Sequence, residues 1–206
     1  MKLKRDFSYS VIFCGIWFNT YMKLVIGITG STGVIYGIRL LEVLKEKGIE
    51  TNLVMSEWAK KCIPMETKHD VAYVESLATE VTDENNMAAN VSSGSHKTDG
   101  MIVIPCTMKT LSSIANGYDE TLVARAAGVT IKEVRKLILV ARETPLSAIH
   151  LENMLKLARL DVVIMPPVTE FYTNPTSIDA MVDHIVGKCL DQFDIEHDLF
   201  TRWGSK

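Results

Sequence analysis

An arginine and a glutamate, Arg142 and Glu143, stand side by side directly after a short apolar run, Leu137 to Val140. Such a run predicts a buried strand, and ligands of open α/β sheets bind where the strands end. A fixed cation beside a titratable acid at that place suits a site that holds an anion and moves a proton. The same pair would equally serve as a salt bridge that fixes a loop, because structural ion pairs also collect at strand ends. These two residues alone favour neither interpretation.

Two segments rich in glycine and hydroxyl residues follow other predicted strands. Gly30 to Gly33 comes after the apolar run Leu24 to Thr29, and Pro105 to Thr110 comes after Met101 to Ile104. Glycine lets the backbone approach a ligand closely, and the amides at a helix start attract phosphate, so both segments are candidate phosphate cradles. A tight turn and an ordinary capped helix start are the structural alternatives. Neither segment matches the GxGxxG fingerprint or the GxxxxGK[ST] P-loop.

Further residues near predicted strand ends are candidates for binding or catalysis. Ser56 follows the second predicted strand, where an NAD site would usually place an acid for the ribose, and this favours a mononucleotide. Cys106 is either a nucleophile or a small buried thiol. Tyr172 follows Pro166 and Pro167, where a phenol could reach a ligand. Cations also occur at or near predicted element ends, although most such side chains are simply solvated: Arg125, Lys132, Arg142 and Lys188.

The elements that must position these residues alternate between strand and helix. Apolar runs predict five strands, at residues 24–29, 51–55, 101–104, 137–140 and 162–165. Helical spacing predicts helices at residues 34–47, from 56, about 109–115, within 119–135, at 147–160 and at 176–193. Residues 67–99 are polar, and we expect an irregular excursion there. The alternation predicts one Rossmann-like (flavodoxin-like) α/β domain of three layers, with a mostly parallel sheet between helices.

Composition excludes several functional classes. The 206 residues carry a formal net charge of −3, which gives no basic surface for nucleic acid. The four cysteines show no CxxC spacing and the five histidines no HExxH or HxxxH pair, so we expect neither a disulfide framework nor a metal site. This usage fits a reducing compartment and a cytoplasmic protein.

The first 21 residues are expected to lie outside the fold. Their apolar run, Val11 to Phe18, is far shorter than the roughly 20 residues of a membrane-spanning helix. No small-residue cleavage site of a signal peptide follows it. Met22 opens directly into the first predicted strand. We therefore expect an N-terminal extension, residues 1–21, that is either an upstream addition or an interaction arm, and one domain at residues 22–206.

Taken in order, the motifs resemble the UbiX/Pad family of flavin prenyltransferases, formerly called aromatic acid decarboxylases. The matching segments are TGSTG, PCTMKTL, ARETPLSAIHLENMLKL, PPVTEFYTNP and a terminal RWG, spread from Met22 to Gly204. The segment SSGSHKTDGMIVIPCTMKTL is similar to the branch that accompanies phenolic acid decarboxylases. The resemblance implies a dodecamer with sites shared between subunits.

The resemblance also implies a reaction. It implies that FMN is bound, that dimethylallyl monophosphate donates its dimethylallyl group to flavin N5 and C6, and that no metal is needed. It implies that the product, prenylated FMN, passes to a UbiD-type decarboxylase as partner. Loss of phosphate must then be assisted by protein cations and an acid, which agrees with the first interpretation of Arg142 and Glu143.

Residue by residue, the resemblance assigns three sets of roles. The FMN-binding set is Gly30, Ser31, Thr32, Ser56, Thr107, Met108, Lys109, Thr110, Arg142 and Arg125. The catalytic set is Glu143, as acid and base acting through the substrate phosphate, with Lys132, Trp203 and Glu66. The substrate-phosphate set is Tyr172 and Lys188. Lys188 is an arginine in some family members; lysine keeps the charge but loses the bidentate fork.

Two other functions are compatible with a flavin-binding sheet. An FMN-dependent cysteine decarboxylase of related fold would need a particular histidine and a PxMNxxMW-type segment. The corresponding segment here reads PPVTEFY, from Pro166 to Tyr172, which does not match. A non-catalytic flavin-binding subunit of a decarboxylase complex is the second alternative, and the density of cations around Glu143 argues against it.

Overall fold

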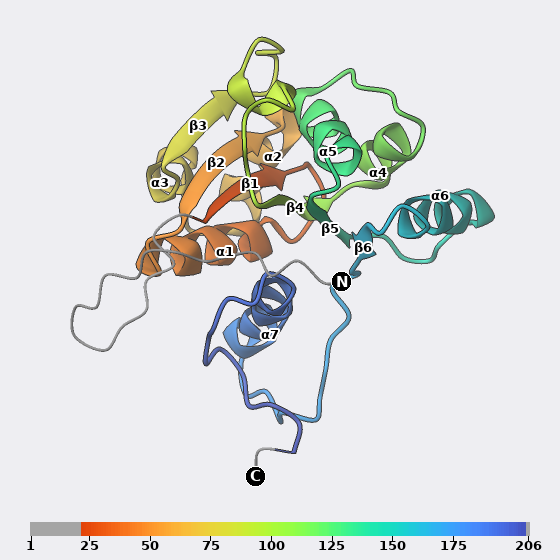
Figure 1. Cartoon of the computed structure of the whole chain (residues 1–206). Coiled ribbons are helices and arrows are strands. Elements are labelled where there is room, and N and C mark those ends of the chain that lie inside the picture. The colour runs from red at the N-terminus through yellow and green to blue at the C-terminus, as the bar shows by residue number, and fades with distance from the viewer. Residues whose placement is uncertain (1–21, 205–206) are drawn as a thin grey trace, which may run out of the picture.

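Strands that are apolar at nearly every position form the centre of the molecule, because strands of a parallel sheet are covered on both faces. The computed structural model describes residues 22–204 and places one six-stranded sheet there, parallel throughout (Figure 1). The strands are β1 (Lys23–Ile28), β2 (Glu50–Met55), β3 (Glu80–Asp83), β4 (Gly100–Cys106), β5 (Lys136–Ala141) and β6 (Val163–Ile164). The predicted N-terminal extension, residues 1–21, lies outside the described residues.

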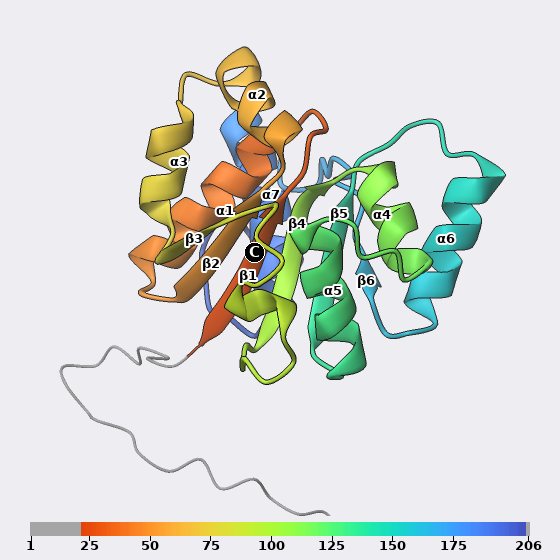
Figure 2. The same cartoon turned by 90° about the horizontal axis from the view of Figure 1, so that it is seen from above.

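Helices cover both faces of this sheet, which confirms the predicted three-layer architecture (Figure 2). One face carries α1 (Val34–Glu46), α2 (Glu57–Glu66), α3 (Val71–Leu77) and α7 (Ile178–Asp191). The other carries α4 (Met108–Ala115), α5 (Leu122–Lys132) and α6 (Ala148–Ala158). No helix in residues 22–204 has the length and apolar character needed to cross a membrane.

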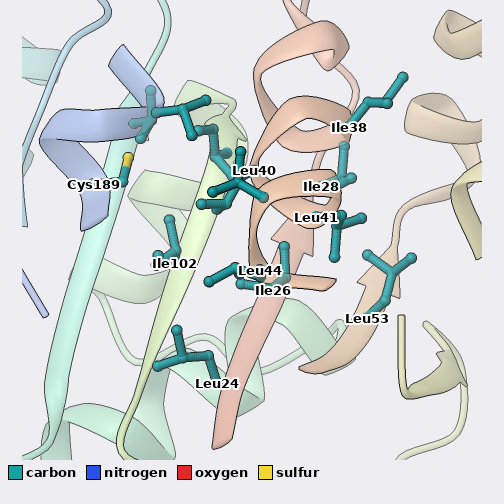
Figure 3. Packing of buried hydrophobic residues seen from close by; sticks show 14 of the residues in the cluster. Leu24, Ile26, Ile28, Ile38, Leu40, Leu41, Leu44, Leu53, Ile102 and Cys189 are labelled. Carbon is teal, nitrogen blue, oxygen red and sulfur yellow. The ribbon is translucent and has the colours of Figure 1, made fainter. Parts of the chain in front are cut away.

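Side chains along β1 alternate between the two layers, as the period of two in a strand requires. Leu24, Ile26 and Ile28 face the core beneath α1, whereas Val25 belongs to the core beneath α5. Figure 3 shows the first of these cores, where Leu40 of α1 lies among the side chains of the sheet. Burial on both faces explains why β1 reads as a continuous apolar run.

The expectation of an irregular excursion at residues 67–99 is wrong. This segment contains α3, the edge strand β3 and a short 3₁₀ helix, η1 (Asn90–Ser92). β3 pairs with β2 alone, and of its four residues only Thr82 is buried, so no apolar run marks it. The Thr82 hydroxyl donates to Asn52 Oδ1 at 3.0 Å. The buried residue of β3 is therefore polar, and it gives no apolar signal that would predict a strand.

Candidate active site

The strand order β3-β2-β1-β4-β5-β6 reverses its direction between β1 and β4. From β1 the chain proceeds outward to β2, and from β4 it proceeds outward the opposite way to β5. At such a switch point the loops that leave the two strands part, and ligands of doubly wound sheets bind in the crevice between them. The two candidate phosphate cradles are the loops that follow β1 and β4, so the fold brings them together at this crevice.

Thr29, at the end of β1, joins the two cradle loops through one buried hydroxyl. Its Oγ1 donates to the carbonyl oxygen of Pro105 at 2.8 Å and accepts from the backbone N–H of Thr107 at 2.9 Å. The residue is only 2% exposed. Sequence reasoning counted Thr29 as the end of a strand and missed this role, because both partners lie more than seventy positions away.

We expect Thr29→Val to loosen both loops, because valine has nearly the same shape but leaves the N–H of Thr107 without its acceptor. An unsatisfied buried donor costs about 1–3 kcal/mol, which urea unfolding would measure. The matched control is Thr130→Val: Thr130 is equally buried, but its hydroxyl contacts the carbonyl of Ala126 in its own helix at 2.8 Å and the sulfur of Met101 at 4.0 Å, and neither contact joins the two loops. Equal losses in the two variants would contradict a special role for Thr29.

The loop after β1 is fixed from below by α2. Gly33 has a φ of +98°, and its N–H donates to Glu66 Oε2 at 2.8 Å. A Cβ on Gly30 would lie 2.3 Å from the Cβ of Trp58, so only glycine fits at this position. The Oγ of Ser31 is buried and has no hydrogen-bond partner among the described residues. Contacts with α2 therefore fix the loop, and the hydroxyl oxygen of Ser31 is left without a partner among the described residues.

The hydroxyls of Ser56 and Thr107 both cap helices. Ser56 Oγ accepts from the N–H of Ala59 at 3.1 Å, and Thr107 Oγ1 accepts from the N–H of Thr110 at 3.1 Å. The capped helix start considered as an alternative is therefore present, and it also orders the amides of the first turn of α4. Around this turn Thr32 and Lys109 are exposed, while Thr107, Met108 and Thr110 are half-buried.

Arg142 and Glu143 form no salt bridge, either with each other or with another residue in the described range 22–204. The backbone N–H of Arg142 donates to the carbonyl of Cys106 at 3.0 Å, which fixes it beside β4. Burial raises the pKa of the Tyr36 phenol, and the nearby Arg142 guanidinium opposes that rise. Glu143 is exposed, and its Oε1 accepts only from the N–H of Thr144 at 3.0 Å. The guanidinium is therefore available to an anion.

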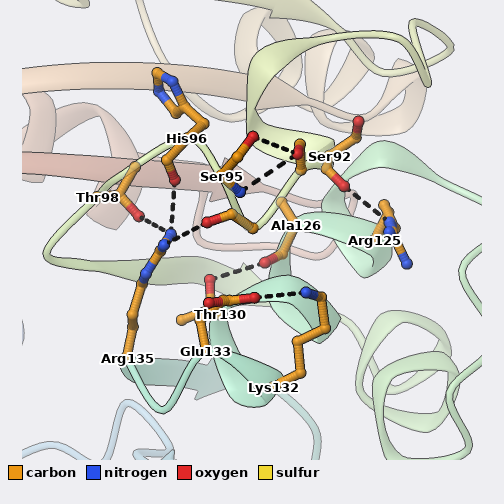
Figure 4. A network of polar contacts seen from close by, with 12 residues as sticks. Ser92, Ser95, His96, Thr98, Arg125, Ala126, Thr130, Lys132, Glu133 and Arg135 are labelled. Atoms are coloured by element: carbon orange, nitrogen blue, oxygen red, sulfur yellow. Dashed lines mark hydrogen bonds and ion pairs between the residues drawn. The ribbon is translucent and has the colours of Figure 1, made fainter.

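Two of the proposed cations lie on α5, and the polar network around them is drawn in Figure 4. Arg125 donates to Asp119 Oδ2 and to the carbonyl of Ser92, both at 3.0 Å. Lys132 forms an ion pair with Glu133 at 2.6 Å. Lys132 ends α5, just before β5 begins, whereas Arg142 follows the end of β5. The six residues of β5 separate the two positions by about 20 Å at ~3.3 Å per residue.

Tyr172, Lys188 and Trp203 form a separate group around α7. The rings of Tyr172 and Trp203 meet edge to face, with centroids 5.3 Å apart. Residues 165–177 and the C-terminal tail run along the side of α7 that faces away from the sheet (Figure 1). Lys188 lies in the last turn of α7. The structure therefore does not bring these three residues to the cradle loops of the same subunit.

Cys106 and the residue types that bind metals were the other candidates for chemistry at the site. Burial raises the pKa of the Cys106 thiol, and the residue is fully buried, which fits the structural thiol rather than a nucleophile. Within residues 22–204, no three His, Cys, Asp or Glu side chains gather as a metal site would require. Whether the reaction proceeds without metal stays a prediction.

Comparison with known proteins finds a matching family model, similar sequences and similar solved structures. The family model described as Flavoprotein matches residues 19–190. A probable UbiX-like flavin prenyltransferase of Streptomyces sp. (strain D7) is 53% identical over 183 residues, covering 88% of this chain and 92% of the relative. The crystal structure of AnUbiX (PadA1) in complex with FMN and dimethylallyl pyrophosphate superposes with a TM-score of 0.88 at 48% identity, covering 90% and 98% of the two chains.

A second solved structure and a more distant one complete the comparison. A dodecameric FMN-dependent UbiX-like decarboxylase from Escherichia coli O157:H7 has a TM-score of 0.87 at 51% identity, covering 89% of this chain and 100% of the other. The peptidyl-cysteine decarboxylase EpiD has a TM-score of 0.58 at 21% identity, covering 73% and 83%. The latter likeness shows a shared fold alone.

Proposed function

This chain belongs to the UbiX-like flavin prenyltransferases, and from that membership we propose that its carboxyl-edge site transfers a dimethylallyl group from dimethylallyl monophosphate to N5 and C6 of FMN. The observation that carries the proposal is Arg142, whose backbone is bonded to Cys106 just before the second cradle loop and whose guanidinium has no ion-pair partner in residues 22–204. A phosphorylated ligand is what such an arrangement can hold.

The cradle residues fit a phosphorylated flavin. Ser31 offers a buried hydroxyl without a partner, and α4 turns its capped N-terminus toward the crevice, where helix amides favour negative charge. Gly30 and Gly33 keep the backbone of the first loop free of side chains. We assign FMN binding to these residues together with Thr32, Ser56, Thr107, Met108, Lys109, Thr110, Arg142 and Arg125.

Glu143 is assigned the proton handling. When the bond from the allylic carbon to oxygen breaks, the departing phosphate gains negative charge, and an acid that holds a proton at its oxygen stabilises that charge. The flavin supplies the two nucleophilic atoms, N5 and C6. Arg142 holds the anion in place. We assign Glu66 the role of fixing the first cradle loop, because its carboxylate accepts a hydrogen bond from the backbone N–H of Gly33.

The remaining assigned residues would reach the site from a neighbouring subunit. Lys132, Tyr172, Lys188 and Trp203 are placed around α5 and α7, apart from the cradle loops, so a complete site needs a second copy of the chain. An edge-to-face aromatic pair and two lysines then cover the allylic phosphate. We assign this chain the dodecameric state that is stated for the Escherichia coli relative.

Helix α6 supports assembly because it presents an apolar surface to solvent. It projects from the edge of the sheet (Figure 2), and its buried residues are only Met154 and Leu157. Leu151 and Leu155 lie one turn apart on the same side of α6 and are 52% and 50% exposed, and Ile149, on another side, is 67% exposed. Apolar residues gathered on one exposed helix usually mark a protein interface. A second copy of this chain is the occupant that an oligomeric family supplies.

We expect Leu155→Glu to shift the assembly to smaller species, because a charge buried in an apolar interface is strongly unfavourable. Light scattering coupled to size exclusion would measure the mass. Met87→Glu is the matched control, since Met87 is an isolated exposed methionine on the loop after β3. An unchanged mass for Leu155→Glu would place the interface elsewhere.

The proposed function is tested by the mass of the flavin. Incubation of the protein with reduced FMN and dimethylallyl monophosphate, without oxygen, should yield a flavin about 68 mass units heavier, the mass of the added C5H8. A parallel reaction with dimethylallyl pyrophosphate compares the donors, and a third with EDTA tests whether metal is needed. Bound FMN without any adduct would leave the alternative of a non-catalytic flavin-binding subunit.

We make three further assignments: the recipient of the product, the location of the protein and the bounds of its domain. We assign the product to a UbiD-type decarboxylase of phenolic acids as its recipient, because residues 92–111 resemble the branch that accompanies such enzymes. The test is to add the product to a decarboxylase that has been prepared without its cofactor and to measure whether its activity is restored.

A cytoplasmic location is supported by the free thiols Cys62, Cys106 and Cys189. We assign residues 22–206 to the catalytic domain and residues 1–21 to an extension; a chain that starts at Met22 should retain the activity.

A further inference from the structure

The C-terminal tail is tied to α7 through one carboxylate, that of Asp191. Arg202 donates to it with both terminal guanidinium nitrogens, Nη2 at 2.7 Å from Oδ1 and Nη1 at 3.2 Å from Oδ2. His197 Nε2 lies 3.1 Å from the same Oδ1. We call Asp191, His197 and Arg202 the tail latch. No sequence motif pointed to Asp191, and the proposed chemistry does not use it.

The charge and packing of the tail latch fit a fixed structure rather than a passing contact. Partial burial by itself would raise the pKa of Asp191, but the bonds from Arg202 and His197 hold it below its usual value. Between the two partners, Phe200 stacks on His184 with ring centroids 4.2 Å apart. A Cβ on Gly187 would lie 2.6 Å from the Phe200 ring, so the absence of a side chain there lets the tail approach α7.

The tail latch holds the residue that precedes Trp203. Trp203 follows Arg202 directly and is 82% exposed, so little packing of its own holds it. Its indole nevertheless meets Tyr172 edge to face at 5.3 Å. An aromatic face stabilises a cation only when the ring is correctly oriented, because the interaction follows the ring quadrupole. A bidentate bond on the preceding residue supplies that orientation.

We propose that Asp191 is a positioning residue for prenyl transfer, which holds the tail through Arg202 and His197 and thereby fixes Trp203 against Tyr172. The inference rests on the proposed function for its catalytic consequence, and on the tail contacts alone for its structural one. The aromatic pair then forms a wall of fixed geometry beside the allylic group as positive charge develops on it.

The test is Asp191→Asn in the full chain, which keeps the shape and removes the charge. We expect chymotrypsin to cleave after Phe200 about 5- to 30-fold faster, as the appearance of the peptide beginning at Thr201 would show by mass spectrometry. We expect kcat for transfer to fall by a similar factor with little change in KM for dimethylallyl monophosphate, because the wall acts on the transition state. Asp198→Asn is the matched control, an exposed aspartate of the same tail.

Arg202→Gln, alone and combined with Asp191→Asn, distinguishes the tail latch from general loosening. The double variant should be no worse than Asp191→Asn alone, because Asp191→Asn already removes the ion pair with Arg202 and weakens the contact with His197. Additive effects would overturn the inference, as would normal cleavage in Asp191→Asn, or faster cleavage with unchanged kcat. A wild-type chain without transfer activity would instead overturn the proposed function, and the protease result would still decide whether Asp191 holds the tail.

Discussion

Replacement of Glu143 by glutamine is expected to slow prenyl transfer about 100- to 10,000-fold, the range that general acid–base catalysis usually contributes. Glutamine keeps the size of the side chain and the acceptor oxygen that now faces the N–H of Thr144. It cannot give up or take back a proton, so the departing phosphate must leave with its full charge. Single-turnover mixing of the FMN-loaded protein with dimethylallyl monophosphate measures this step directly.

Flavin binding should survive the same change, because the anion-holding group is Arg142 and the loops are held by Thr29 and Glu66. Titration of FMN against the variant checks this. Glu46→Gln serves as the control, since Glu46 is an exposed glutamate in the last turn of α1, to which no role in the site or in assembly is assigned. If Glu143→Gln transferred at the wild-type rate, proton handling would have to be assigned to another group.

The central strands and their helices could be predicted because burial imposes a pattern on the sequence. β1 and β5 are covered on both faces and read as uninterrupted apolar runs. Gly48 stands just after α1 with a φ of +68°, a conformation that glycine adopts readily at a helix end. β3 was not predicted, because an edge strand with one buried residue carries no such apolar pattern. The two-residue β6 was expected to be longer, since its neighbours are also apolar.

The site divides in the same way. Loops that follow strands are predictable, because parallel topology brings strand ends to one edge, and the cradle loops and the Arg142–Glu143 pair were found so. The contacts that fix these loops were not. Thr29 with Thr107, and Gly33 with Glu66, join positions far apart in sequence, and no local pattern encodes them. The tail latch is of the same kind, because His197 and Arg202 read as ordinary polar tail residues.

Mixed assemblies of two inactive variants should recover activity if the site is shared between subunits. Glu143→Gln and Lys132→Met each lack one assigned group, and each homogeneous assembly should be nearly inactive. Glu143 follows the carboxyl end of β5, whereas Lys132 precedes its amino end, so one subunit cannot bring both to one crevice. When the variants assemble together in equal amounts, about a quarter of the sites combine a native Glu143 with a neighbour's native Lys132. Transfer should return to about that fraction of the wild-type rate.

The control for this recovery pairs two defects that must stay together. Arg142 and Glu143 are consecutive in the chain, so any site that takes one from a subunit takes the other from the same subunit. Mixtures of Arg142→Met with Glu143→Gln should therefore stay inactive at every ratio. Recovery in this control would mean that subunits had merely stabilised one another. No recovery in the Lys132→Met mixture would contradict a site in which Glu143 of one subunit meets Lys132 of a neighbour.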